Sequence, residues 1–129
     1  MNRIHNPKTI AAPGGRYSHG VEVPPNARWL YVSGQVGVAP DGKVPAGIGP
    51  QVENCWRNIL AILADAGMGL GDVVKVTVLL IRDSDISAYR EARDRVIGDA
   101  RPASTLMVIS RLASPDYLVE IEAVAAKAP

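Results

Sequence analysis

The last apolar stretch of the chain, Tyr117–Ala125, alternates with a period of two, which is typical of a β-strand. One face carries only apolar side chains, those of Val119, Ile121, Ala123 and Ala125. The other face carries Leu118, Glu120, Glu122 and Val124. A solvent-lined edge strand would accommodate the two carboxylates, but the Val, Ile and Ala content favours a central strand. Because charges are rarely buried without a partner, we expect at least one glutamate to face a cleft or a subunit interface.

Similar patterns predict four more strands and two helices. The predicted strands are Tyr17–Val23, Arg28–Ser33, Val73–Ile81 and Thr105–Ile109. The predicted helices run from Pro50 to a glycine cap at Gly67 and from Ile86 to Ile97, before Gly98. A short proline-containing loop joins the first two strands and suggests a hairpin. The third strand is a continuous aliphatic run, which is typical of a strand buried on both faces.

The order of these elements predicts one α+β domain that spans residues 1–129, with a mixed sheet and two helices on one face. A chain of this length can bury a single core. Because two helices cover only one face of such a sheet, we expect another subunit to cover the other face.

The composition of the chain argues against several classes of function. The net charge is +1 and aromatic residues make up only 5% of the chain, which argues against a nucleic-acid-binding surface. No apolar run reaches membrane-spanning length, and the first residues lack the apolar core of a secretory signal. Cys55 is the only cysteine, which fits a reducing compartment, so the cytoplasm is the expected location. The two histidines do not form a metal-ligand spacing with nearby carboxylates.

Several short motifs, taken together and in order, resemble the Rid family, which is also called YjgF or L-PSP. They are Gly15–Gly20, Val32–Gln35, Ala66–Gly67, Gly71–Lys75, Arg101–Ala103, Arg111–Leu112 and Val119–Ala123. The resemblance covers nearly the whole chain. It implies a chorismate-mutase-like α+β fold with a six-stranded mixed sheet, and a homotrimer with clefts between its subunits. It also implies hydrolysis of reactive enamines and imines to keto acids and ammonia, a small-molecule substrate, and no cofactor or metal.

The resemblance also implies roles for individual residues. Glu120 matches the glutamate that positions the attacking water, which is the chemistry that imine hydrolysis needs. The alternative is a structural role, in which Glu120 forms an ion pair across a subunit interface. The expected substrate-binding residues are Tyr17, Ser33, Gly34, Ser104, Thr105, Leu106 and Arg101. Leu106 stands where the archetype has a cysteine, so only its backbone can contribute.

Ser104 departs from the family pattern, because the deaminating members carry an arginine there that binds the substrate carboxylate. A serine supplies one hydrogen bond but neither charge nor a planar fork. Losing a bidentate charge-assisted grip costs about a hundredfold or more in binding. Arg101, Arg16 and Arg90 are candidates to compensate, although each is more often a surface charge. On a straight strand, the three-residue offset of Arg101 would point it to the opposite face.

Three hypotheses follow. The first is a hydrolase of the enamine or imine deaminase type with altered substrate choice. The second is a trimeric protein that binds a metabolite in the same clefts without catalysis. The third is a ribonuclease, which the charge and the lack of aromatic residues disfavour. Glu122 is expected to be structural and paired with Lys75 or Arg111, and Cys55 to belong to the core.

Overall fold

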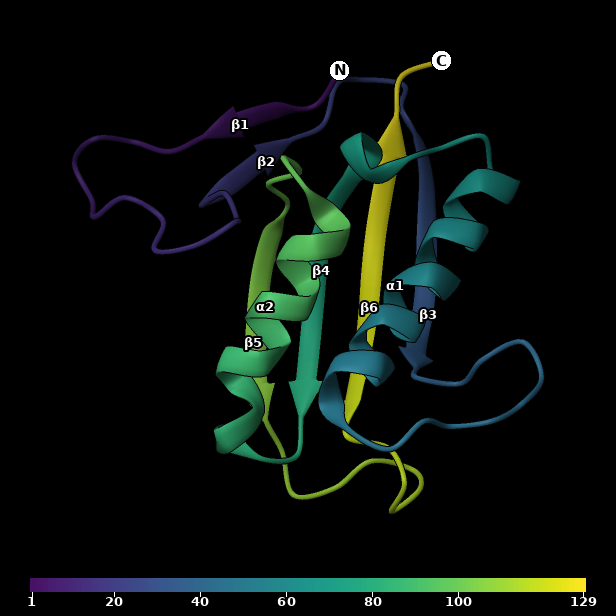
Figure 1. Cartoon of the computed structure of the whole chain (residues 1–129). Coiled ribbons are helices and arrows are strands. Elements are labelled where there is room, and N and C mark those ends of the chain that lie inside the picture. The colour runs from purple at the N-terminus through teal and green to yellow at the C-terminus, as the bar shows by residue number, and fades with distance from the viewer.

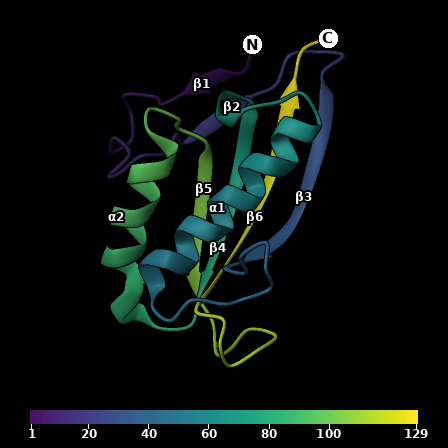
Figure 2. The ribbon, with the colours of Figure 1, turned by 45° about the vertical axis from the view of Figure 1, so that its right-hand side comes forward.

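The computed structural model describes residues 1–129 and consists of a four-stranded mixed sheet with two helices on one face (Figure 1). The strands lie in the order β3 (Arg28–Val36), β6 (Val119–Lys127), β4 (Val73–Leu80) and β5 (Ala103–Val108). β6 is antiparallel to both neighbours, whereas β4 and β5 are parallel. The helices are α1 (Ile48–Asp65) and α2 (Ile86–Ile97); in the turned view α1 crosses in front of the strands and α2 lies to one side (Figure 2). The predicted α+β architecture is therefore confirmed.

The prediction of a single six-stranded sheet is wrong, because two of the six strands form a separate sheet. β1 (Arg3–His5) and β2 (Gly20–Glu22) pair with each other beside the main sheet. The predicted hairpin between Tyr17–Val23 and β3 does not form either, since β3 pairs with β6. The physical reason is that Ser18 attaches to the edge of β5: its backbone N–H donates to the carbonyl of Pro102 at 3.1 Å.

The central position of β6 confirms the prediction from its alternation. All four side chains of its apolar face are buried against the helices, at 3% exposure or less. The apolar stripe of α1 meets them, and its buried members are Val52, Cys55, Trp56, Ile59 and Leu63. Both predicted glycine ends are confirmed: Gly98 directly follows α2 with a φ angle of 53°, and Gly67 follows α1 after Ala66 with a φ angle of 69°. Local spacing thus sufficed to define the helical layer.

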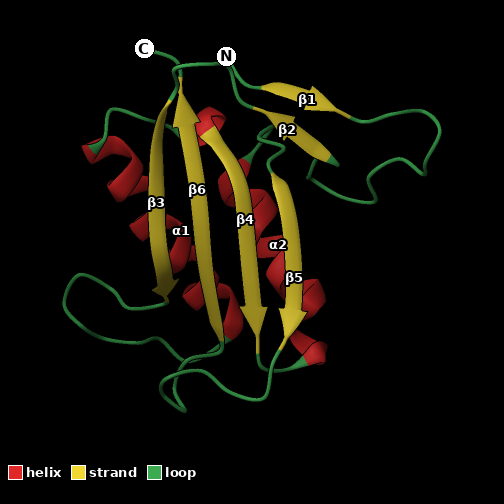
Figure 3. Ribbon diagram, turned by 180° about the vertical axis from the view of Figure 1, so that it is seen from behind, coloured by secondary structure: helices red, strands yellow, loops and turns green.

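The sheet face away from the helices is open in the single chain, as Figure 3 shows from behind. We call it the outer face. In β4, Val76, Val78 and Leu80 are buried, but Lys75 and Thr77 on the outer face are only half-buried. The expectation that this strand is buried on both faces is therefore wrong for one chain, because both helices pack on the same side. No helix is long and apolar enough to cross a membrane.

Candidate functional site

The Glu120 carboxylate lies against the backbone of β3. Glu120 pairs with Val36, next to an irregularity in the β3–β6 register between Val32 and Gln35. This irregularity contains Gly34, and a Cβ atom added there would lie 2.8 Å from Cδ of Glu120 and closer still to Oε2. The missing side chain of Gly34 therefore creates the space that the carboxylate occupies.

Glu120 is half-buried and takes part in none of the ion pairs or side-chain hydrogen bonds of the chain. A half-buried carboxylate without a partner retains free acceptor lone pairs that a water molecule or a ligand can use. The carboxylate thus lies against the backbone of β3 and has no ion-pair partner within the chain.

One buried residue, Gln51, supports the segment before Glu120. Gln51 is 1% exposed and its amide nitrogen donates to the carbonyls of Pro45 and Asp116, both at 2.9 Å. Its amide oxygen accepts from the backbone N–H of Leu118, also at 2.9 Å. Gln51 therefore ties the start of β6 to α1, two residues before Glu120.

Cys55 belongs to the core, as predicted. It is fully buried, and burial, with a smaller contribution from the charge of Glu120, raises the pKa of its thiol to about 12. Because the thiolate is the reactive form of cysteine, this residue is not a nucleophile near neutral pH.

A separate cavity of about 230 Å³ lies between α2, β5 and the loop before β2. We call it the α2 cavity; its lining residues are Gly14, Gly15, Tyr17, Tyr89, Arg90, Arg93, Ser104 and Leu106. It brings together three predicted site residues, Tyr17, Ser104 and Leu106. Tyr17 reaches it because its neighbour Ser18 is fixed to the end of β5, where Oγ donates to the carbonyl of Arg101 at 2.6 Å.

Ser33 and Thr105 lie elsewhere, on the outer face. Ser33 lines a cavity of about 330 Å³ between β3, β6 and β4, together with Lys75 and Glu122. Lys75 does not pair with Glu122: its Nζ donates to Oγ1 of Thr105 at 2.6 Å. The expected ion pair of Glu122 with Lys75 or Arg111 is therefore absent from the chain.

The predicted site residues thus occupy three places in one chain. Tyr17, Ser104 and Leu106 line the α2 cavity, Ser33 lines the outer-face cavity, and Glu120 with Gly34 lines neither. No group of three or more His, Cys, Asp or Glu side chains is arranged to hold a metal ion.

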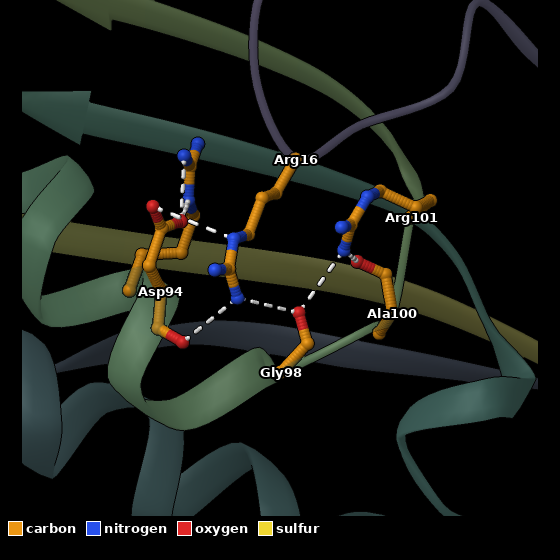
Figure 4. A network of polar contacts seen from close by, with 6 residues as sticks. Arg16, Asp94, Gly98, Ala100 and Arg101 are labelled. Carbon is orange, nitrogen blue, oxygen red and sulfur yellow. Dashed lines mark hydrogen bonds and ion pairs between the residues drawn. The ribbon is translucent and has the colours of Figure 1, made fainter.

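The three arginines named as substitutes for the family arginine differ in where they lie. Arg101 does not line the cavity that contains Ser104, and its Nη1 donates to the carbonyls of Gly98 and Ala100, both at 3.0 Å (Figure 4). Arg16 is bound to the end of α2, where Nη1 donates to the carbonyl of Gly98 at 2.8 Å. Only Arg90 lines the same cavity as Ser104.

Sequence reasoning missed two residues of this cavity, Tyr89 and Arg93. Both are buried, at 1% and 9% exposure, and the Arg93 guanidinium lies 5.7 Å from the centre of the Tyr89 ring. The available signal was their spacing of four residues, which places them on one face of α2. The abundance of charge on this helix concealed that signal, because it suggested a largely solvated helix.

The family model for Endoribonuclease L-PSP matches residues 8–127. The chain belongs to the Rid (YjgF, L-PSP) family. Among curated Rid relatives, a RutC family protein of Pyrococcus abyssi is 38% identical over 117 residues, which is 89% of each chain. The 2-iminobutanoate/2-iminopropanoate deaminase of Mus musculus is 34% identical over 125 residues, 94% of this chain and 90% of the relative.

Solved Rid structures share the fold over nearly the full length. YyfB of Yersinia pestis has a TM-score of 0.86 at 27% identity and covers 98% of each chain. TdcF of E. coli, solved with bound serine, has a TM-score of 0.74 at 27% identity and covers 98% of this chain and 99% of its own. The structural likeness therefore extends to a relative that binds a small molecule.

Proposed function

We propose that this protein hydrolyses small imines or enamines at clefts between the subunits of a homotrimer, and that Glu120 is the catalytic residue. Water oxygen adds to the electrophilic carbon of the C=N bond, and the proton that water loses is passed to nitrogen. The hydroxyl group of the resulting carbinolamine then gives up its proton, which is passed to nitrogen as the C–N bond breaks, so that ammonia leaves and a C=O group remains. Glu120 orients the water and accepts its proton.

The observation that carries this proposal is the unpaired, half-buried Glu120 carboxylate on the backbone of Gly34. A carboxylate that packs against the Gly34 backbone and keeps free lone pairs can accept a hydrogen bond from a water molecule and orient it. The activity named for the mouse relative, acting on 2-iminobutanoate and 2-iminopropanoate, supports this reaction class. The serine bound to TdcF supports a ligand of similar size.

The distribution of the site residues supports an assembly in which neighbouring copies share a cleft. Within one chain, Glu120 lies apart from the cavity that contains Tyr17 and Ser104. The outer face also exposes a stacked pair of aromatic rings, Trp29 and Tyr31, at 52% and 75% exposure. Such exposed aromatic surface favours coverage by another subunit. Ser33, Gly34 and Thr105 then line the cleft together with residues of a neighbouring copy.

The decisive experiment compares Glu120→Gln with Glu122→Gln, a matched control on the same strand and face. An amino-acid oxidase generates 2-iminopropanoate or 2-iminobutanoate in the reaction, and the rate of keto acid formation is measured. We expect Glu120→Gln to lose about a hundredfold or more of the rate and Glu122→Gln to retain it. Saturable ligand binding by a wild-type protein that never accelerates hydrolysis would instead show a binding protein without catalysis.

A mixing experiment tests whether the cleft is shared between subunits. Tyr17→Phe and Glu120→Gln chains are unfolded together, refolded and compared with each variant alone, with the trimer verified by light scattering. If each site takes these residues from different subunits, random mixing restores about a quarter of the sites. Absence of any restored activity in verified mixed trimers would place both residues in the same subunit's site.

A further inference from the structure

The segment that carries Tyr17 is hydrogen-bonded to the helical layer through one side chain. Residues 7–17 form no strand or helix, and the hydrogen bonds that join them to α2 all come from Arg16. Its Nη1 donates to the carbonyls of Gly98 at 2.8 Å and of Asp94 at 3.3 Å (Figure 4). The backbone N–H groups of Gly14 and Tyr17 bond only within the segment. Without Arg16, residues 7–17 would therefore have no hydrogen bond to α2.

The acceptors of Arg16 lie at the C-terminal end of α2. The last four carbonyls of a helix have no partner within it, and a cation is favoured there. Nε of Arg16 also lies 3.6 Å from Oδ2 of Asp94, but the two side chains are 40% and 36% exposed, so this ion pair contributes little by itself. The two hydrogen bonds to carbonyl oxygens, donated by a charged group, therefore make up most of the attachment.

Tyr17 lies between two anchored neighbours. Arg16 attaches the chain to α2 on one side of Tyr17. On the other side, Ser18 is 2% exposed and its Oγ donates to the carbonyl of Arg101, before β5, at 2.6 Å. Because α2 and β5 both contribute walls of the α2 cavity, the two anchors fix Tyr17 relative to both walls. Arg16 does not itself line this cavity, so it can affect a ligand there only through its neighbour.

We propose that Arg16 is a positioning residue, which holds Tyr17 at the wall of the α2 cavity and thereby sets the affinity for the substrate. This inference rests on the proposed function, because it takes Tyr17 to contact the substrate. The Tyr17 hydroxyl accepts from the backbone N–H of Gly14 at 3.3 Å, so its own proton remains available to a ligand. Without Arg16 the segment would hold this hydroxyl in place for only a fraction of the time, and the apparent affinity would fall in proportion to that fraction.

The kinetic test compares Arg16→Gln with the wild-type protein and with Arg28→Gln. Arg28 is the matched control, because its guanidinium donates to the carbonyl of Ala66, directly after α1, at 3.3 Å and so caps the other helix. We expect Arg16→Gln to raise KM for 2-iminopropanoate about tenfold and to leave kcat within about twofold, because Glu120 is undisturbed. Arg16→Lys keeps one charged donor and should recover part of the loss. Arg28→Gln should retain the wild-type KM and kcat.

A double variant shows whether Arg16 acts through Tyr17. Added to Tyr17→Phe, the Arg16→Gln change should raise KM by less than about twofold, because the hydroxyl that Arg16 positions is already absent. Effects on KM that multiply in the double variant would overturn the inference. So would a folded Arg16→Gln protein with the wild-type KM, or one in which only kcat falls.

Hydrogen exchange measured by mass spectrometry tests the attachment without any substrate. In Arg16→Gln the amides of residues 12–18 should exchange about tenfold faster, whereas those of β6 should stay as protected as in the wild-type protein. Unchanged exchange of residues 12–18 would overturn the inference. Faster exchange in Arg16→Gln, with no imine hydrolysis by the wild-type protein, would remove the hydrolase and leave the attachment of Tyr17. Wild-type hydrolysis, with KM and exchange both unchanged in Arg16→Gln, would retain the hydrolase and remove the positioning role.

Discussion

Replacing Gly34 with alanine should displace the Glu120 carboxylate without removing it, and so test whether its position matters for the rate. The new Cβ atom would lie 2.8 Å from Cδ and 3.0 Å from Cγ of Glu120. Carbon atoms make their best contact at about 3.5 to 4 Å, so the carboxylate must move by about 1 Å. A displacement of this size in a catalytic group costs about a hundredfold in rate.

The same substitution should barely change stability. The end of the Glu120 side chain is flexible, and moving it off its rotamer costs about 0.5 to 1.5 kcal/mol. Alanine in place of glycine also restricts the unfolded chain, which offsets about 0.4 to 1 kcal/mol. We therefore expect the free energy of unfolding to change by less than about 1 kcal/mol.

Gly37→Ala is the contrasting variant. Its Cβ atom would lie 2.6 Å from Cβ and 2.7 Å from Cα of Gln51, a buried residue in the first turns of α1. Backbone cannot move aside as a side-chain end can, so this variant should lose about 3 kcal/mol or more of stability. The two glycines are three residues apart, Gly34 within β3 and Gly37 directly after it, so the comparison distinguishes displacement of the Glu120 carboxylate from general damage to this part of the chain.

The assay combines urea unfolding with the rate of keto acid formation from 2-iminopropanoate. The double variant Gly34→Ala/Glu120→Gln should be no slower than Glu120→Gln alone, because both changes remove the same interaction. A folded Gly34→Ala protein with the wild-type rate would refute the reasoning. Rate losses that multiply in the double variant would show that Gly34 acts independently of Glu120.

Two further predictions concern the support of the site. Gln51→Leu leaves three backbone groups without their hydrogen-bond partners and should lower the free energy of unfolding by about 3 to 5 kcal/mol. Chemical denaturation measures this change, and a loss below about 1 kcal/mol would show that Gln51 does not stabilise this segment. The Cys55 thiol has a pKa of about 12 in the folded chain and about 8.5 when unfolded, so its contribution to stability is complete below about pH 8.5 and is lost as the pH rises toward 12. Cys55→Ala should therefore flatten the alkaline fall in stability by about 1 kcal/mol per pH unit between pH 9 and 11; an unchanged slope would show that the thiol ionises freely in the fold.

The helices and the inner face of β6 could be read from the sequence because they depend on local spacing. α2 runs from Ile86 to Ile97 and is followed by Gly98, as its pattern predicts. The period of two in β6 identifies which side chains are buried, since alternation fixes the face of each residue whatever strand lies beside it. The same alternation places Glu120 on the opposite face but does not set its exposure, because Glu122 on that face is exposed whereas Glu120 is half-buried.

The pairing of the strands and the arrangement of the candidate site could not be predicted from the sequence and became known only from the tertiary structure. The segment before Pro24 could pair with β3 or with β1, and only the attachment of Ser18 to β5 decides between them. The contact between Glu120 and Gly34 likewise joins residues that are remote in the sequence.

The arginines show most clearly what the sequence determined and what it did not. The sequence places two positively charged residues, Arg90 and Arg93, on α2. Whether such a charge meets solvent, a carboxylate or a cavity depends on the element packed against the helix, here β5 and the loop that contains Tyr17. Helical spacing determines on which side of its own helix a residue lies. A binding site also depends on how several helices and strands lie relative to one another, and only the packing of the whole chain determines that.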